Sequence, residues 1–296
     1  MTALKTRIAP SPTGHLHLGH VLHIMCVQGI AMKLGADISL RLEDHDQSRC
    51  RPEFASSILE DLAWLGVKLP KKLWHQSQRN EVYQTNLEDL MRKGLVYACS
   101  CSRKNIQLDT EQSSGELRYP GTCREKNIPL NQPDTCIRLK IPNGDISFSD
   151  LFLGELKNNP ADQSGDVVIR DRIGQWTYQY AVVIDDLDQE INLIIRGKDL
   201  LSSTARQLVM RDIISPGKSK PIFAHHPLIA DNSGNKLSKR FLSEALSVLR
   251  NNGISADKIR GMAAHLAGLT ETDCEITIAS IPNLFPNSTL KLPNQK

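Results

Sequence analysis

The sequence has no apolar run long enough to cross a bilayer, which argues against a chain that spans the membrane through helices. Its N-terminus lacks a signal-peptide pattern, because Pro10 and Pro12 fall where an apolar stretch would have to lie. Net charge is also low, since 36 lysines and arginines against 33 aspartates and glutamates leave +3. This balance permits a nucleic-acid partner without requiring one, so any basic surface has to be local. We therefore expect a cytoplasmic protein with no membrane partner.

The cysteines do not form an even set for disulfides. There are seven, and an odd number favours a reduced environment over a disulfide framework. Three of them, Cys99, Cys101 and Cys123, are spaced as in a metal site. The other four have no partner pattern and are expected in ordinary packing or at the surface: Cys26, Cys50, Cys136 and Cys274.

Strands alternate with helices over most of the 296 residues. The spacing of apolar residues predicts the first elements as a strand over 4–9, a helix from Leu18 that ends at Gly35, a strand over 38–42, and helices over 54–65 and 82–91. Later apolar strands are expected at 167–170, 181–184 and 191–195. Asp199 is a good N-cap for a helix that runs to about Ile214. The alternation predicts an α/β fold with a Rossmann-like parallel sheet that binds ligands at the carboxyl ends of its strands.

Residues 97–159 interrupt this alternation with the clustered cysteines, several prolines and short strands. We expect an insertion here that holds the metal site, between catalytic-domain segments 1–96 and 160–240. Residues 241–296 are expected to form one or two short helices and a polar tail. We find no internal repeat.

The clustered cysteines predict a structural zinc site, which needs four donors in a tetrahedron. Tyr119 lies four residues before Cys123 and offers a phenolate oxygen as the fourth donor. The spacing leaves two alternatives open: His75 as the fourth ligand, or three reduced cysteines without a metal.

Two segments carry the strongest functional signal. Residues 7–20 read Arg-Ile-Ala-Pro-Ser-Pro-Thr-Gly-His-Leu-His-Leu-Gly-His, and residues 236–240 read Lys-Leu-Ser-Lys-Arg. They resemble the HIGH and KMSKS signatures of class I aminoacyl-tRNA synthetases, with Arg240 where serine is commoner. The resemblance implies activation of an amino acid with ATP. His17 and His20 are three residues apart and share a helical face, and the helix N-terminus beneath them favours phosphate.

Residues 7–14 resemble the glutamate branch of that class. Further motifs of the branch follow in order: Leu42 to Asp46 with Arg49, His75 to Arg79 with Tyr83, Arg196 to Leu201, and Ser203 to Gln207. Within the branch the chain is most similar to the glutamyl-queuosine tRNA(Asp) synthetases, a family of shortened relatives of glutamyl-tRNA synthetase. The cysteine cluster resembles the zinc site of that family. The short stretch after residue 240 leads us to expect no anticodon-binding domain.

The resemblance implies a role for each matching residue. His17, His20 and Lys239 are expected to be catalytic, and with Gly19 they bind ATP. The glutamate site maps onto Arg7, Ile8, Ala9, Pro10, Ser11, Glu43, Tyr178 and Arg196. The two arginines suit the substrate carboxylates, Glu43 its ammonium group, and Tyr178 offers a hydroxyl. One structural zinc is expected on Cys99, Cys101, Tyr119 and Cys123.

The family's reaction attaches activated glutamate to the queuosine base in the anticodon of tRNA(Asp). The implied partners are therefore L-glutamate, ATP with Mg²⁺, and that anticodon loop, bound by a monomer. Two alternatives remain: a truncated glutamyl-tRNA synthetase that charges the 3′ end of tRNA(Glu), and an inactive binding module. We expect Arg41 to form a surface ion pair, and His15 and His23 to have no catalytic role.

Overall fold

The computed structural model describes residues 3–109, 117–229, 244–286 and 290. Its first parallel sheet contains β1 (Lys5–Ile8), β2 (Asp37–Leu42) and β3 (Trp74–His75), in the order β1-β2-β3. A second sheet has the order β7-β6-β10-β9, from β6 (Ile146–Asp150), β7 (Gly154–Asn158), β9 (Leu193–Gly197) and β10 (Ile222–His226). The core is thus an α/β fold with parallel pairing, as predicted.

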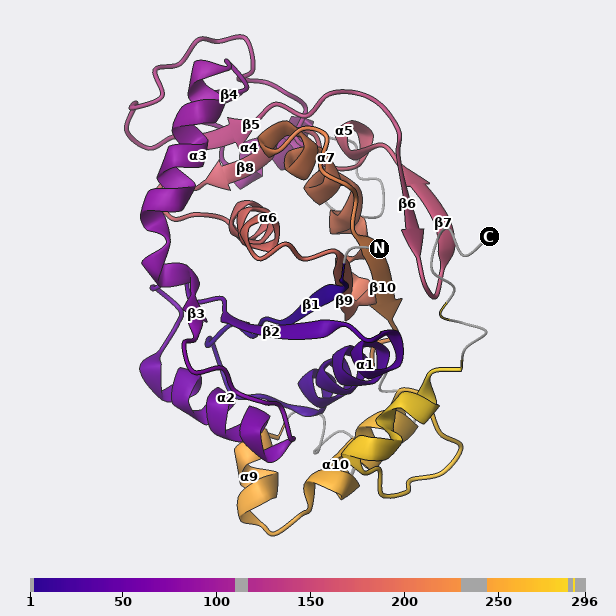
Figure 1. Cartoon of the computed structure of the whole chain (residues 1–296). Coiled ribbons are helices and arrows are strands. Elements are labelled where there is room, and N and C mark those ends of the chain that lie inside the picture. The colour runs from indigo at the N-terminus through magenta and orange to yellow at the C-terminus, as the bar shows by residue number, and fades with distance from the viewer. Residues whose placement is uncertain (1–2, 110–116, 230–243, 287–289, 291–296) are drawn as a thin grey trace.

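The two sheets meet where β1 lies beside β9 (Figure 1). The backbone N–H of Lys5 donates to Asn192 Oδ1 at 2.7 Å, and the N–H of Asn192 donates to the carbonyl of Lys5 at 3.1 Å. The combined order therefore runs β3-β2-β1, then β9-β10-β6-β7. The chain winds in opposite directions from β1 and β9, so their carboxyl ends mark the switch point where doubly wound sheets bind ligands.

Helix α1 (Leu18–Leu34) packs between the sheets and the C-terminal helices and is buried over most of its length. It ends as predicted at Gly35, whose φ of 65° is the left-handed conformation that glycine adopts without penalty. The other helices of the core are α2 (Pro52–Trp64), α3 (Asn80–Arg92), α6 (Tyr178–Asp188) and α7 (Thr204–Ile214).

Two sequence predictions in this region are wrong. Residues 181–184 lie inside α6 and do not form a strand. A short apolar run does not distinguish a strand from a buried helical turn, and here the run continues into Asp185 and Asp186, which α6 buries with it. Asp199 does not cap the helix that follows it, because residues Lys198–Ser203 form a 3₁₀ turn and α7 begins only at Thr204.

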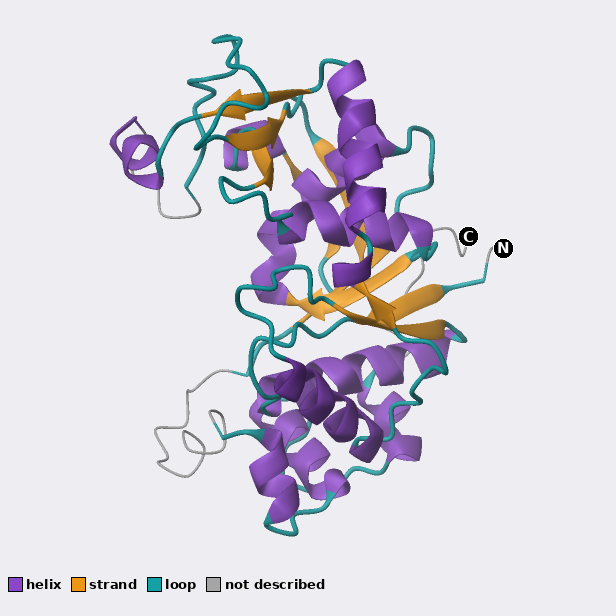
Figure 2. Ribbon diagram, turned by 90° about the vertical axis from the view of Figure 1, so that its left-hand side faces the viewer, coloured by secondary structure: helices purple, strands orange, loops and turns teal. Residues whose placement is uncertain are grey.

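A separate antiparallel sheet contains β4 (Val96–Cys99), β5 (Cys136–Leu139) and β8 (Val167–Arg170). With α4 (Arg103–Asp109) and α5 (Pro160–Gln163) it forms the upper part of the molecule in Figures 1 and 2, and we call it the upper module. Strand pairing crosses the expected boundary at residue 160, because β8 follows that point but pairs with β5, whereas β6 precedes it but pairs with β10.

The lower part of the molecule consists of helices, as expected for the C-terminal segment (Figure 2). It contains α9 (Leu246–Asn251), which packs against α2. It also contains α10 (Ala256–Leu266) and a 3₁₀ turn, η3 (Ile278–Leu284), which both pack against α1. Among the described residues, no helix is both long and apolar enough to cross a membrane.

Candidate active site and metal centre

The N-terminus of α1 is capped by the two signature histidines. His17 is the N-cap, and its Nδ1 accepts the backbone N–H of Gly19 at 3.1 Å. In return His20 Nδ1 accepts the backbone N–H of His17, also at 3.1 Å. This reciprocal arrangement is a capping box built from imidazoles, and it fixes both rings at the start of the helix.

The capping contacts determine which nitrogen of each ring carries the proton. Because Nδ1 accepts a hydrogen bond in both residues, each neutral ring carries its proton on Nε2. Burial, together with the neighbouring His17, lowers the pKa of His20 to about 4. Burial also lowers the pKa of His17. At neutral pH the pair therefore offers two Nε2–H donors as neutral groups.

Gly19 is required by this cap. A Cβ on Gly19 would lie 2.9 Å from Cε1 of His17, closer than side-chain atoms pack. A substitution here would displace the His17 ring. We therefore expect Gly19 to act at least partly through His17.

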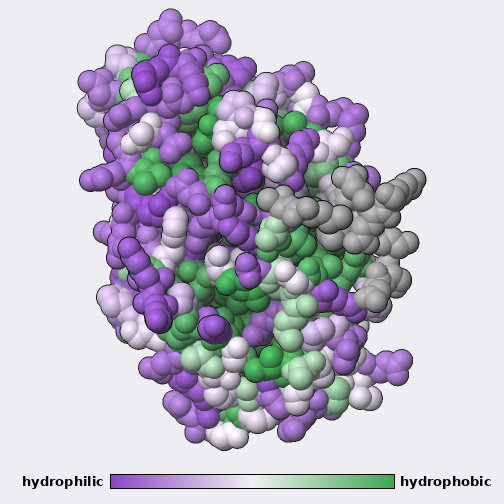
Figure 3. Space-filling view, in the orientation of Figure 1, coloured by the Kyte–Doolittle hydropathy of each residue, from purple (hydrophilic) through white to green (hydrophobic). Residues whose placement is uncertain are grey.

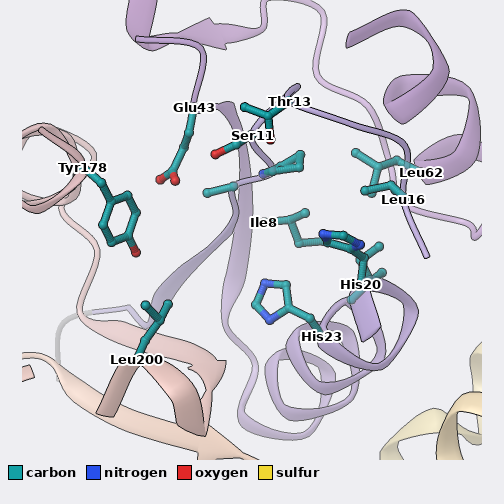
Figure 4. A pocket seen from close by; sticks show the side chains of 13 residues that line it. Ile8, Ser11, Thr13, Leu16, His20, His23, Glu43, Leu62, Tyr178 and Leu200 are labelled. Atoms are coloured by element: carbon teal, nitrogen blue, oxygen red, sulfur yellow. The ribbon is translucent and has the colours of Figure 1, made fainter. Parts of the chain in front are cut away.

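A pocket of about 420 Å³ opens beside the capped helix, at the carboxyl end of β1 (Figure 4). Figure 4 shows Glu43 and Tyr178 on one side, His20 and Leu16 on the other, and Ile8 between them. Its lining includes seven of the expected site residues: Ile8, Ala9, Pro10, Ser11, His20, Glu43 and Tyr178. Glu43 lies directly after β2, so this strand carries it to the pocket.

His23 also lines this pocket, although the sequence analysis assigned it no role. It lies one turn beyond His20, and its Nδ1 is 3.2 Å from Nε2 of His226. His226 Nδ1 must donate to the carbonyl of Pro227 at 2.8 Å. The Nε2 of the neutral His226 therefore accepts a hydrogen bond from His23 Nδ1. His23 Nε2 is then left as an acceptor. The spacing His17–His20–His23 was the available signal in the sequence.

His15, in contrast, agrees with the expectation of a residue outside the site. Its ring is exposed, lies edge-on to Phe54 at 4.9 Å, and has Nδ1 3.2 Å from the hydroxyl of Ser57. It does not line the pocket.

Buried ion pairs form the floor next to Glu43. Arg41 is fully buried, and its guanidinium contacts Glu43 at 3.0 Å and Asp186 at 2.9 Å. The expectation of a surface ion pair at Arg41 is therefore wrong, because β2 is covered on this face by α6. Burial opposes the charge of Arg41, yet the carboxylates of Asp186, Glu43 and Asp185 raise its pKa. The ion pairs keep this cation in place.

Arg7 belongs to the same network. Its Nε donates to Asp186 at 3.1 Å and its Nη1 to the carbonyl of Ile195 at 3.4 Å. Burial raises the pKa of Glu43, although Arg41 and Arg7 act in the opposite direction. The network therefore fixes the orientation of Glu43 while its side chain still reaches the pocket (Figure 4).

Arg196 differs from Arg41 and Arg7 in the charge of its hydrogen-bond partners. It is 3% exposed, and the described residues that accept its hydrogen bonds are neutral: His225 at 3.0 Å, Gln207 at 2.6 Å and Thr204 at 2.7 Å. Burial lowers its pKa to about 10. A guanidinium held without a carboxylate in a buried site is a strong binding position for a substrate anion.

The orientation of Arg196 is set from behind by His225 and Asp150. Asp150 Oδ2 lies 2.6 Å from His225 Nδ1, and His225 Nε2 accepts the Nε–H of Arg196. Asp150 itself accepts the backbone N–H groups of Phe152 and Leu153, at the turn between β6 and β7. Asp150 and His225 carry no signal of this role in the sequence, because strands far apart in the chain bring them together.

The upper module contains the predicted metal cluster. The Sγ atoms of Cys99, Cys101 and Cys123 lie within 4.8 Å of one another, so these residues together can hold a metal ion. The Tyr119 hydroxyl is 3.3 Å from Cys99 Sγ and 4.0 Å from Cys101 Sγ. Donors about 2.3 Å from one zinc ion at tetrahedral angles are about 3.8 Å apart, so this set fits zinc.

The remaining expectations about the cluster are resolved by position. His75 is not near it, because its Nδ1 pairs with Asp44 at 2.9 Å beside β2. Cys136, expected in ordinary packing, lies directly opposite Cys99 in the β4–β5 pair and in the same buried cluster.

Lys239 and the rest of the 236–240 signature lie outside the described residues.

Comparison with known proteins identifies the family of this chain. Residues 3–275 match the family model described as tRNA synthetases class I (E and Q), catalytic domain. The chain is 36% identical over 285 residues to a glutamyl-Q tRNA(Asp) synthetase of Nitratidesulfovibrio vulgaris, which covers 90% of this chain and 87% of that protein. It is 34% identical to a glutamate–tRNA ligase of Lawsonia intracellularis over 98% of this chain, but spans only 62% of that protein.

A solved structure shares the fold. The glutamate–tRNA synthetase from Elizabethkingia anophelis superposes with a TM-score of 0.77 at 24% identity. The match covers 97% of this chain and 66% of that one.

Proposed function

Because the chain belongs to the catalytic-domain family of class I tRNA synthetases for glutamate and glutamine, we propose that it activates L-glutamate with ATP and transfers it to the queuosine base in the anticodon of tRNA(Asp). Relatives named glutamyl-Q tRNA(Asp) synthetase support the acceptor, since the chain covers 87% of the N. vulgaris protein at 36% identity. The protein would act in the cytoplasm.

The charged residues at the pocket and buried beside it support glutamate as the amino acid. Arg196 is a buried cation with neutral hydrogen-bond partners, which suits the side-chain carboxylate of the substrate. Glu43 provides the anion for the ammonium group, and Tyr178 lies between the two ends with a hydroxyl to donate. Arg7 is already paired with Asp186, so we assign it a weaker share of carboxylate binding than Arg196.

The capped end of α1 supports the phosphoryl chemistry. An oxygen of the glutamate α-carboxylate attacks the α-phosphorus of ATP, and the bond from phosphorus to the pyrophosphate oxygen breaks as the new bond forms. Negative charge grows on the departing pyrophosphate. The Nε2–H donors of His17 and His20 and the helix N-terminus stabilise this charge without a change in their own protonation. Lys239 is proposed as the cation for the outer phosphates.

The second step transfers glutamate to the RNA. A hydroxyl of the queuosine cyclopentene diol attacks the carbonyl carbon of the mixed anhydride, and the bond to AMP breaks as the ester forms. Glutamyl-adenylate should form before RNA binds, because the glutamate and ATP positions belong to one pocket at the switch point of the sheet.

We assign the metal site a structural role with one zinc on Cys99, Cys101, Tyr119 and Cys123. Four protein ligands leave no open position for water, so the ion would hold the upper module together and do no chemistry. In this assignment residues 97–159 hold the metal. Segments 1–96 and 160–240 hold the catalytic site, with Asp150 behind Arg196, and α10 and η3 within 241–296 support α1.

The buried position of Arg196 with neutral partners is the observation that carries the proposal, because it calls for an anionic substrate. The test measures glutamate-dependent exchange of labelled pyrophosphate into ATP without RNA. Labelled glutamate is then offered with tRNA(Asp) that carries or lacks queuosine. Exchange that requires RNA, or no exchange at all, would contradict the first step. Label on tRNA(Asp) lacking queuosine would contradict the second.

A second candidate is transfer to the 3′ end of tRNA(Glu), favoured by the 34% identity to the L. intracellularis ligase. The same experiment with tRNA(Glu) distinguishes the two, since removal of the 3′-terminal adenosine would block transfer only in this case.

A further inference from the structure

A second cavity, of about 650 Å³, lies between the upper module and helices α6 and α7. Thr177 and Gln179 at the start of α6 line this cavity, whereas Tyr178 between them lines the catalytic pocket. The two cavities are therefore neighbours across the first turn of one helix. A ligand large enough to fill both would pass over that turn.

The walls of the cavity carry an excess of positive charge. Four arginines line it, Arg103, Arg138, Arg172 and Arg206, against two aspartates, Asp166 and Asp171.

Both aspartates are already engaged by other groups. Asp166 is paired with Arg124 at 3.2 Å and accepts the Tyr97 hydroxyl at 2.6 Å. Asp171 accepts the backbone N–H groups of Ile173 and Gln175. Asp166 is thus neutralised largely by an arginine outside the lining, and Asp171 keeps its charge, so the four lining arginines still outnumber the carboxylate charge that faces the cavity.

The cations are arginines held in defined orientations. Arg138 stacks on the Tyr119 ring at 3.7 Å and donates to the backbone carbonyl of Asp166. Arg172 is exposed and donates to the carbonyl of Ser100 at 2.7 Å, which links the loop after β8 to the cysteine segment. Oriented guanidinium groups of this kind suit phosphate oxygens, which accept two parallel hydrogen bonds.

An apolar tip stands at the mouth of the cavity. Ile173 is 76% exposed, next to Arg172, in the tight turn that joins β8 to α6. The turn is closed by hydrogen bonds between Asp171 and Gln175 and between Gly174 and Asp171. Figure 3 shows mostly hydrophilic side chains, with some hydrophobic ones, over the upper part of the molecule. Among the described residues, Ile173 is the most exposed of the large hydrophobic side chains. An apolar side chain on a rigid turn beside arginines is suited to a nucleobase.

We propose that this cavity and the Arg172–Ile173 tip form the docking surface for the RNA strand. Its arginines take phosphates of the anticodon loop, and Ile173 packs against a base next to the one that enters the catalytic pocket. This inference rests on the proposed function and assigns the RNA a path. Phosphate contacts hold the loop against the upper module, while the modified base passes over Tyr178 toward the adenylate.

The test compares two variants that each lose one positive charge. Arg172→Ala removes a cation of the docking surface, and Lys258→Ala removes an exposed cation on α10, at the other end of the molecule. Binding of a queuosine-bearing anticodon stem-loop is measured over a range of salt concentrations, together with RNA-free pyrophosphate exchange and the melting temperature. Ile173→Ser is measured in the same way.

Arg172→Ala should weaken RNA binding about five- to tenfold and lower the slope of log K against log salt by about 0.7–0.9, the loss of one phosphate contact. Ile173→Ser should weaken binding and leave the slope unchanged. Pyrophosphate exchange should be that of the unmodified protein in all three variants, and Lys258→Ala should bind RNA normally.

Equal RNA binding by Arg172→Ala and Lys258→Ala would overturn the docking surface. A loss of pyrophosphate exchange in Arg172→Ala that matches its loss of RNA binding would also overturn it, because the loop would then serve activation. Failure of the proposed function has a separate sign, namely that the unmodified protein shows no glutamate-dependent exchange.

Discussion

Replacing Arg196 by methionine is expected to abolish the response to glutamate while leaving the free energy of unfolding nearly unchanged. The guanidinium is buried, and its pKa is about 10 where 12.5 is usual. A pKa change of one unit corresponds to about 1.4 kcal/mol. Keeping Arg196 charged in the site without substrate therefore lowers the free energy of unfolding by an amount on the order of 3 kcal/mol. Removing the charge relieves this cost. Three neutral acceptors then lose a donor, at about 1 kcal/mol each. The two effects cancel to within about 1 kcal/mol.

Arg41→Met is the matched control, because Arg41 is equally buried in the same site but is paired with carboxylates. Its removal leaves Glu43 without its guanidinium partner and weakens the neutralisation of Asp186. Breaking a buried ion pair from one side costs about 3–5 kcal/mol. The two substitutions remove the same chemical group. The difference between their changes in the free energy of unfolding therefore reports only whether the partners of the arginine are charged or neutral.

The assay is chemical denaturation with and without L-glutamate. At a ligand concentration 100 times Kd the unmodified protein should gain about 2.7 kcal/mol, whereas Arg196→Met should gain nothing. L-glutamine, which lacks the second carboxylate, should stabilise the unmodified protein less than glutamate does. The reasoning is refuted if Arg196→Met without ligand is as unstable as Arg41→Met, or if glutamate still stabilises it.

Three further outcomes are expected. Glu43→Gln should raise the KM for glutamate in pyrophosphate exchange roughly tenfold or more, because a charge-assisted contact contributes about 1.5–3 kcal/mol, and an unchanged KM would remove Glu43 from the site. Elemental analysis should find one zinc per chain, and Cys101→Ser should lose zinc and melt at a lower temperature with little change in exchange; a metal-free native protein would contradict this. The melting temperature should fall as pH decreases from about 6.5 toward 4, because burial holds the pKa of His20 and His226 below the usual 6.5 and the unfolded chain then takes up more protons; a melting temperature that rises over this range would contradict the assignment.

Local patterns were sufficient for the elements that frame the site. The helix from Leu18 to Gly35 was predicted from apolar spacing and a terminal glycine, since both signals lie within a few residues of the structure they produce. The apolar run at 181–184 was misassigned for the same reason. It is short enough to fit a strand or a helical turn, and only packing inside α6 distinguishes them. The role of residues 236–240 in ATP binding and the role of Tyr119 as a zinc ligand stay predictions.

The sequence by itself determined the family, the parallel α/β core and most of the pocket lining, because these depend on short motifs and on period. Tertiary structure decided the charge state and neighbours of the site. Arg41 is buried because α6, from 145 positions further along the chain, covers β2, and His23 faces the pocket beside His226, which lies 203 positions away. Arg196 obtains its neutral partners from α7 and β10. These contacts follow from the order in which strands join the sheet, and that order is set by the cooperative burial of the whole core, which no local pattern records.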